Sequence, residues 1–200
     1  MPPNNEIAKL GKLIAVQHGW AAAKAFKSYE LNEADQAVLS RCAIDLLKIF
    51  PPVPGACALL SAALAVALER HMNAPIHVVA GSLEVEGVPV LGDRQFFDGT
   101  PVFSTPNPHW DGHAWVMVGC YVVDIAIFRT AYSNEGPPRL AQHIDLTFGP
   151  GKALYVDHWK RTRRVGLGYE LHYVLSEGEV NNLMGCAFHL IDRKRHAPLS

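Results

Sequence analysis

The chain has 200 residues, of which 49% are hydrophobic and 18% charged, and its formal net charge is −1. These values are typical of a globular protein and exclude an intrinsically disordered chain. A net charge so close to zero provides no general attraction to nucleic acid or to an anionic membrane. We therefore expect neither as a partner.

The cysteines and the apolar segments indicate in which cellular compartment the protein is expected. No CxxC pair occurs among Cys42, Cys57, Cys120 and Cys186, which argues against a disulfide scaffold and a cysteine-only zinc site. The first twelve residues lack the apolar core of a signal peptide, and the longest apolar stretch, 56–68, is too short to cross a bilayer. These features predict a cytoplasmic protein, in which a reactive thiol would stay reduced.

The first third of the sequence is predicted to be helical. Residues 6–29 are rich in Ala, Lys and Leu, with a break expected at Gly19. Asn32 is a favourable N-cap for a second helix, which the prolines from Pro51 onward would end. A third helix is expected at 56–72, and because it is apolar nearly all round it should be buried.

After Pro75 the apolar pattern has the period of two that is typical of strands. Glu86-Gly87 would turn a first hairpin and Gly119-Cys120 a second. Ser176 and Glu179 match a capping box that precedes a last helix, 177–191. We expect strands at 76–85, 88–91, 113–118, 121–127, 154–159 and 168–175, a long loop at 92–110, and irregular chain at 129–151.

Helices followed mainly by adjacent strands predict an α+β fold, in which N-terminal helices and a buried helix that carries Cys57 pack on an antiparallel sheet. The length fits a single domain over 1–200. Within it we expect a helical N-terminal part at 1–50, a catalytic core at 51–127, and the remainder of the sheet with the last helix at 128–200.

Cys57 is the strongest candidate for a reactive group. It would lie in the first turn of the buried helix, where free N–H groups and the helix dipole stabilise a thiolate. Its own N–H could also donate to an oxyanion. The alternative is that Cys57 is a small hydrophobic residue of the core.

His113 and Asp124 are the candidate base and its orienting carboxylate. If Gly119-Cys120 is a two-residue turn, Trp115 lies opposite Asp124, and His113 is a diagonal neighbour of Asp124 on the same face. A three-residue turn would place the two side chains on opposite faces. The proposed pair is therefore a prediction about strand register.

Cys57 in GACALLSAALAVAL, His113 in HAWVMV and Asp124 in YVVDI follow one another in the order seen in transglutaminase-like members of the papain-like cysteine enzymes, a superfamily that the chain resembles over about 52–127. The resemblance implies a Cys57–His113–Asp124 triad and acyl transfer through a thioester, with no cofactor. It implies hydrolysis or transfer at an amide or isopeptide bond of a peptide, a protein or a small amide. The chain departs from the papain-like pattern because no glutamine shortly precedes Cys57, so the second oxyanion donor has no assignment.

Other patterns compete with this interpretation. A binding module could retain the fold without the chemistry. His109, Asp111 and His113 alternate and could instead hold a zinc ion, although a polar loop that leads into a strand is the favoured explanation. Trp110 and Trp115 flank His113 and could wall a substrate cleft. A basic run, Lys160, Arg161, Arg163 and Arg164, is typical of a solvated turn, though it could receive an acidic peptide or nucleic acid.

Overall fold

The computed structural model describes residues 3–93, 97–105 and 110–196. Its first three helices are α1 (Pro3–Ser28), α2 (Glu33–Ile49) and α3 (Cys57–Glu69). The expected break in α1 occurs at Gly19, whose φ of 85° lies outside the helical region. Asn32 caps α2 as predicted and forms a capping box with Asp35. The buried helix begins at Cys57 itself, so the sulfur is carried by the first helical residue.

The described strands form an antiparallel sheet around the long, fully buried strand β1 (Ile76–Val85). β1 pairs with β2 (Val88–Leu91), with β3 (His113–Val118) and with β6 (Leu167–Val174). β4 (Tyr121–Asp124) and β5 (Tyr155–His158) continue the sheet beyond β3. The predicted α+β class with an antiparallel sheet is confirmed.

The register of the β3–β4 hairpin agrees with the prediction. Val118 pairs with Tyr121 and Val116 with Val123, so Gly119-Cys120 is a two-residue turn. This pairing places His113 and Asp124 on the same face of the hairpin.

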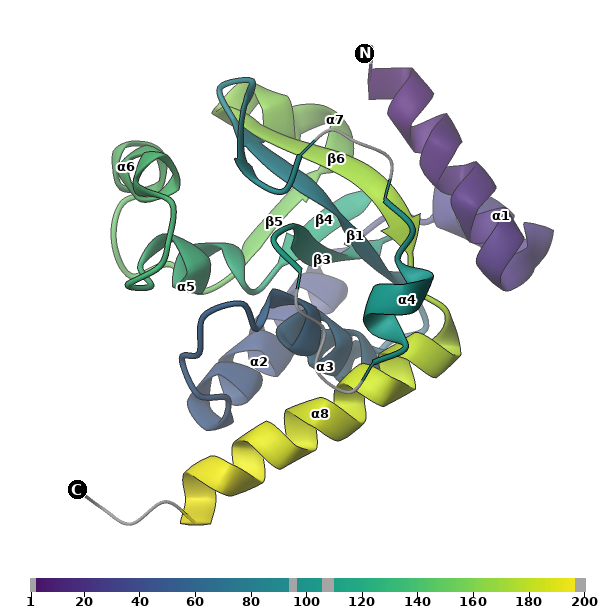
Figure 1. Cartoon of the computed structure of the whole chain (residues 1–200). Helices are drawn as coiled ribbons and strands as arrows, with labels where there is room; N and C mark the ends of the chain where they lie inside the picture. Colours follow the sequence, from purple (N-terminus) through teal and green to yellow (C-terminus); the bar gives the residue numbers. More distant parts are fainter. Residues whose placement is uncertain (1–2, 94–96, 106–109, 197–200) are drawn as a thin grey trace.

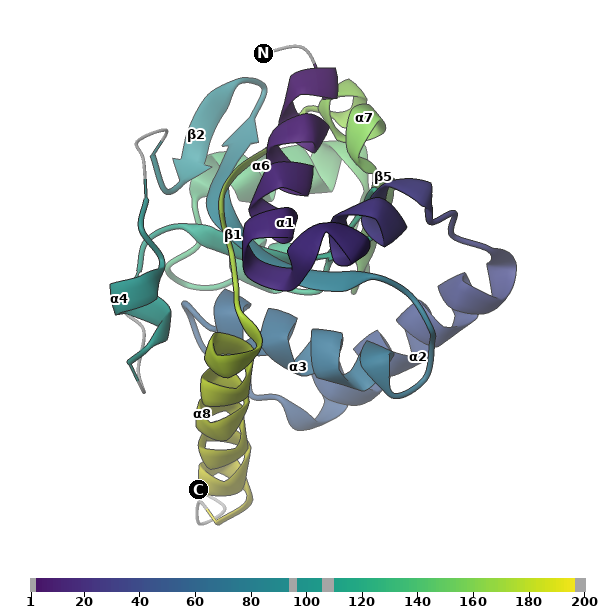
Figure 2. The same ribbon diagram turned by 90° about the vertical axis from the view of Figure 1, so that its right-hand side faces the viewer.

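Helices cover both faces of the sheet (Figure 1). Alternate residues of β3 divide between two hydrophobic cores: Ala114 and Val116 contribute to a core with α2, α3 and α8 (Glu177–His196), whereas Trp115 and Met117 contribute to one with α1. Figure 2 shows α1 lying across the sheet and α3 beneath it. A buried hydrogen bond from the Ser61 hydroxyl to the Ala114 carbonyl, 2.9 Å long, fixes α3 against β3.

Three segments differ from the prediction. The expected loop at 92–110 contains a short helix, α4 (Thr100–Phe103). The expected strand at 121–127 ends at Asp124 because that carboxylate accepts from the N–H groups of Ala126 and Ile127 and starts α5 (Ile127–Ala131). Residues 129–151 are irregular only in part, since they contain the end of α5 and the helix α6 (Pro138–Thr147).

The basic run lies in α7 (Trp159–Thr162) and the 3₁₀ helix η1 (Arg163–Val165). Arg163 approaches three carboxylates, those of Glu6, Glu84 and Glu170, at 3.0 to 3.8 Å. The positive charge of Arg163 is therefore balanced by carboxylates of the same molecule. The last helix begins with the predicted capping box, in which Glu179 accepts from the Ser176 N–H at 2.8 Å.

Among the described residues, no helix combines the length and the apolar character that crossing a membrane requires.

Candidate active site

Cys57 lies at the N-terminus of α3, directly after a proline-rich segment. Gly55 precedes it with a φ of 71°, a left-handed conformation that lets the chain turn sharply into the helix. The first N–H groups of a helix have no partner within it, and the helix dipole adds positive potential there. The Cys57 side chain is almost buried, with 8% of the residue exposed.

His113 and Asp124 form the pair that the register predicted. Nε2–H of His113 donates to Oδ2 of Asp124 at 2.6 Å, and both side chains are completely buried. Nδ1 of His113 has no hydrogen bond to any described residue. Cys57 lies close enough to the imidazole to influence its pKa. The ring therefore uses one nitrogen for the carboxylate and leaves the other for the thiol.

Opposing effects act on the pKa of His113. Burial lowers it, because a charged ring loses its hydration. The Asp124 carboxylate, with a smaller contribution from Cys57, more than offsets burial and raises the pKa of His113 to about 10. The imidazole is therefore protonated near neutral pH. A positive ring beside the sulfur is the environment that stabilises a thiolate.

Asp124 connects several parts of the site. Its Oδ2 also accepts from the hydroxyl of Tyr169 at 3.0 Å, and its Oδ1 accepts from the N–H groups of Ala126 and Ile127, each at 2.9 Å. These bonds satisfy the oxygens of a carboxylate with no exposed surface. They also hold the carboxylate in the orientation that presents Oδ2 to His113.

Gly112 lies between Cys57 and β1 at the start of β3. Sγ of Cys57 lies 4.0 Å from the Gly112 carbonyl oxygen. A Cβ at Gly112 would lie 2.7 Å from the Gly81 carbonyl oxygen and 2.0 Å from the Trp110 ring. Only glycine fits here, immediately before His113.

Arg129, from α5, fixes the segment that leads into Cys57. Its guanidinium donates to the carbonyls of Leu47 at 2.6 Å, Phe50 at 2.9 Å and Pro51 at 3.3 Å. These carbonyls belong to the end of α2 and the start of the proline-rich segment. Because Asp124 holds the start of α5, the base, its carboxylate and the nucleophile's segment are mechanically linked.

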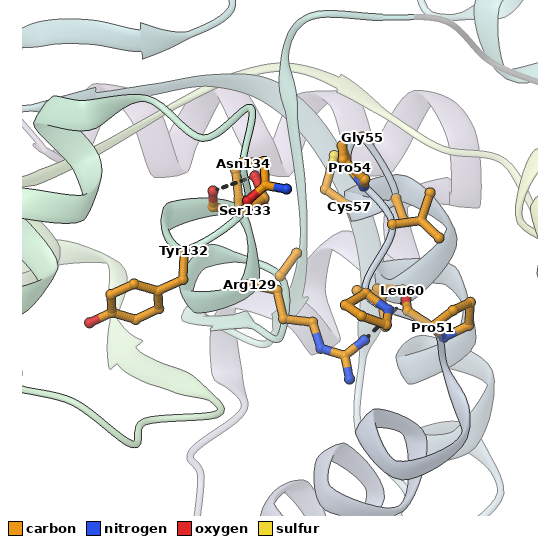
Figure 3. A pocket seen from close by; sticks show the side chains of 14 residues that line it. Pro51, Pro54, Gly55, Cys57, Leu60, Arg129, Tyr132, Ser133 and Asn134 are labelled. Carbon is orange, nitrogen blue, oxygen red and sulfur yellow. Dashed lines mark hydrogen bonds between the residues drawn. The ribbon is translucent and has the colours of Figure 1, made fainter. Parts of the chain in front are cut away.

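A cavity of about 390 Å³ opens beside Cys57, between the proline-rich segment and α5 with its following turn. Figure 3 shows Asn134 across this cavity from Cys57, with its amide nitrogen directed toward the cysteine side. The turn that carries Asn134 is fixed by hydrogen bonds from Ser133 to the Thr130 carbonyl and from the Gly136 N–H to the Ser133 carbonyl.

The two tryptophans occupy different environments. Trp110 is half-buried and stacks on Phe97, with ring centroids 5.0 Å apart. Trp115 is fully buried and packs edge-to-face on Tyr169. Trp115 therefore has no surface for a substrate and supports the His113 side of the core instead, so a role in a cleft wall remains a hypothesis for Trp110 alone.

Only two residues of the alternative metal triplet, Asp111 and His113, can be placed, because His109 lies outside the described residues. Across the described ranges, no cluster of three or more His, Cys, Asp or Glu side chains is arranged to hold a metal ion. His113 has its Nε2 committed to Asp124.

Sequence reasoning missed Tyr169, Arg129 and Asn134. The first belongs to a strand that meets β1 only through a long-range pairing, and the other two lie in a segment predicted to be irregular. One local signal was available: an aspartate can accept from the N–H groups two and three residues later in an Asx turn, and such a turn would have ended the strand at Asp124.

No protein-family model, no curated protein and no solved structure matches the chain. The geometry of the site is therefore the basis for any functional proposal.

Proposed function

We propose that the protein is a cysteine-nucleophile hydrolase or acyltransferase that acts on an amide bond through a thioester. The observation that carries the proposal is the buried His113, which donates through Nε2 to Asp124 while its free Nδ1 is left for Cys57. The same three residues carry the resemblance to transglutaminase-like cysteine enzymes, and membership of that family is part of the proposal. The substrate would be a peptide, a protein or a small amide.

The reaction would follow from the positions of these groups. The Cys57 thiolate adds to the carbonyl carbon of the amide and forms a C–S bond. The C–N bond then breaks, and the His113 imidazolium gives its proton to the leaving amine. Water, or a second amine, gives a proton to His113 and attacks the thioester. The C–S bond breaks, which releases the acid or the new amide and restores the thiolate and the imidazolium. Asp124 keeps Nε2 occupied, so Nδ1 carries the exchanged proton.

The negative oxygen of the tetrahedral intermediate needs donors. The Cys57 N–H at the start of α3 is one. For the second, we assign the Asn134 amide, which is exposed, faces Cys57 across the cavity and has no hydrogen bond to the described residues. It would take the place of the glutamine that the sequence lacks before Cys57.

The test combines turnover with detection of the acyl-enzyme. Purified wild type, Cys57→Ala and Cys120→Ala would be incubated with a panel of peptidyl aminocoumarin amides, with intact-mass spectrometry to detect acylation. Cys120 is the matched control because it is a free, half-buried cysteine outside the site. We expect hydrolysis and acylation in wild type and Cys120→Ala, and loss of both in Cys57→Ala. Wild-type hydrolysis by Cys57→Ala would refute the proposal.

A non-catalytic binding module is the second candidate, and the low exposure of Cys57 favours it. The pH dependence of iodoacetamide labelling separates the two. If Cys57 is catalytic, the pH profile of its labelling should change in His113→Gln, and the labelling rate at neutral pH should fall. A binding module would show the same ordinary thiol profile in both proteins.

A further inference from the structure

The cavity beside Cys57 has a distinctive lining. One wall is the proline-rich segment with Val53, and Leu60 of α3 and Ala126 also line the cavity. The opposite wall is α5 and the turn after it. Polar side chains, Ser133 and Asn134, lie together in that turn (Figure 3). The cavity is thus apolar along its length and polar at the side where Asn134 lies.

Charge is the second feature of the lining. Among the described residues that line the cavity, Arg129 alone carries a charge at neutral pH, apart from the Cys57 thiolate that the proposed function invokes. Its guanidinium is occupied by the carbonyls of Leu47, Phe50 and Pro51. Tyr132 directs its hydroxyl away from the cavity and donates to Asp145 at 2.6 Å. The described lining therefore offers no carboxylate to a cationic ligand, and its one guanidinium already donates to three carbonyls.

The volume limits the size of the ligand. At about 390 Å³, the cavity is near the lower end of small-molecule sites, which range from about 300 to 1,000 Å³. This space accommodates one bulky amino-acid residue or an acyl group of similar size.

We propose that this cavity binds the acyl side of the substrate and selects an uncharged, apolar group of about one residue next to the reacting carbonyl. The inference rests on the proposed function and adds its specificity. An apolar group exchanges water contacts for the proline, valine and leucine surfaces. A carboxylate or an ammonium would lose its hydration. An ammonium finds no carboxylate in the described lining, and a carboxylate would have to compete with three carbonyls for Arg129. The polar end near Asn134 is left for the carbonyl oxygen.

The experiment uses covalent probes that differ only in the acyl residue: the chloromethyl ketones of N-acetyl-leucine, N-acetyl-glutamate and N-acetyl-lysine. The sulfur of Cys57 displaces chloride, and the rate is followed by intact-mass spectrometry. Each rate is divided by the iodoacetamide rate of the same protein, which removes differences in thiol reactivity. Val53→Lys places a cation in the cavity, and Val88→Lys is its control, since both valines are 43% exposed and Val88 lies on β2, outside the lining.

The expected result is that the leucyl probe labels Cys57 about tenfold faster than either charged probe, a discrimination within the range of apolar pockets. Val53→Lys should lose most of this preference and gain rate with the glutamyl probe, while Val88→Lys behaves as wild type. Equal normalised rates, a preference for a charged probe, or a preference unchanged in Val53→Lys would overturn the specificity and leave the nucleophile intact. If no probe labels Cys57 and iodoacetamide reacts identically in wild type and His113→Gln, both the specificity and the proposed function are wrong.

Discussion

The Asp124 carboxylate lies 2.6 Å from Nε2 of His113 and, through its other oxygen, accepts from the first N–H groups of α5. One side chain therefore fixes the candidate base and also the helix that carries Arg129. Buried carboxylates need such partners, because an unpaired charge without water is costly. Asp124 is the residue through which catalysis and folding are expected to be most strongly coupled.

Asp124→Asn should separate these two roles. The amide keeps an oxygen for the α5 N–H groups but no longer places a negative charge beside His113. We expect kcat/KM to fall by about 10²-fold or more, and iodoacetamide labelling of Cys57 at pH 7 to slow, because the imidazolium is no longer stabilised. Loss of one partner in a buried ionic pair should also lower the free energy of unfolding by about 3 kcal/mol.

The control for this change is Asp145→Asn, at a surface carboxylate that accepts from the Tyr132 hydroxyl. It should leave labelling and turnover unchanged. A wild-type pH profile of labelling in Asp124→Asn would contradict the proposed role of the carboxylate.

His113 should make stability fall as the pH rises. Its pKa in the folded protein is about 10, above the ordinary value of 6.5. Below pH 6.5 both folded and unfolded chains hold the proton, so the stabilisation is fully present. Between pH 6.5 and 10 the unfolded chain loses the proton first, and the stabilisation disappears progressively. Urea unfolding of wild type and His113→Gln at intervals from pH 6 to pH 10 should give curves that converge with rising pH; parallel curves would show that the pKa is not raised.

The sequence was sufficient for the local part of the site. The His113–Asp124 pair follows from alternation along two strands and a two-residue turn, which are features of short range. The start of α3 at Cys57 follows from the prolines before it and the apolar run after it. That Cys57 lies beside the His113–Asp124 pair was not predictable from spacing. This arrangement depends on how α3 docks on β3 through Ser61 and Gly112.

The missed start of α5 has a specific cause. The segment after Asp124 lacks strong amphipathic periodicity near its start, and its helix begins because a buried carboxylate accepts from its N–H groups. This contact is local, between a side chain and the backbone two and three residues later, and reading 121–127 as one strand overlooked it. As a result Arg129, which lies in α5, was placed in irregular chain.

His77 should act on stability in the opposite direction to His113. Neither ring nitrogen has a hydrogen-bond partner among the described residues, and burial, with a smaller effect of His18, lowers the pKa of His77 to about 4. As the pH falls from 6.5 to 4, His77 binds a proton in the unfolded chain but not in the folded chain, so the free energy of unfolding falls. His77→Leu should flatten the slope of unfolding free energy over this range, whereas His71→Leu, at an exposed histidine, should not.

Arg129 should be a positioning residue whose loss affects Cys57 indirectly. Arg129→Ala removes three hydrogen bonds from a cation to carbonyls at the entrance to the Cys57 segment. We expect about 2 kcal/mol lower unfolding free energy and a reduced kcat with little change in KM. Arg129→Lys should restore only part of kcat, since the ammonium reaches fewer carbonyls.

Arg161→Ala, at an ion pair with Asp157, is the control and should change stability by less than about 1 kcal/mol. Equal kcat in wild type and Arg129→Ala would show that the proline-rich segment keeps its conformation without Arg129.

Asn134 provides the most direct test of the oxyanion assignment. Its side chain is exposed and has no hydrogen bond to the described residues, so Asn134→Ala should leave the free energy of unfolding within about 0.5 kcal/mol of wild type. If the amide donates to the tetrahedral oxyanion, kcat should fall by about 10²-fold while KM and the iodoacetamide rate of Cys57 stay unchanged, because only the transition state gains from the donor. Asn134→Asp should be slower still, since a carboxylate would repel the oxyanion.

Asn181→Ala, at an exposed asparagine of α8, is the matched control. An unchanged kcat in Asn134→Ala would assign the second donor elsewhere, and an equal fall in iodoacetamide rate would mean that Asn134 acts on the thiol rather than on the oxyanion.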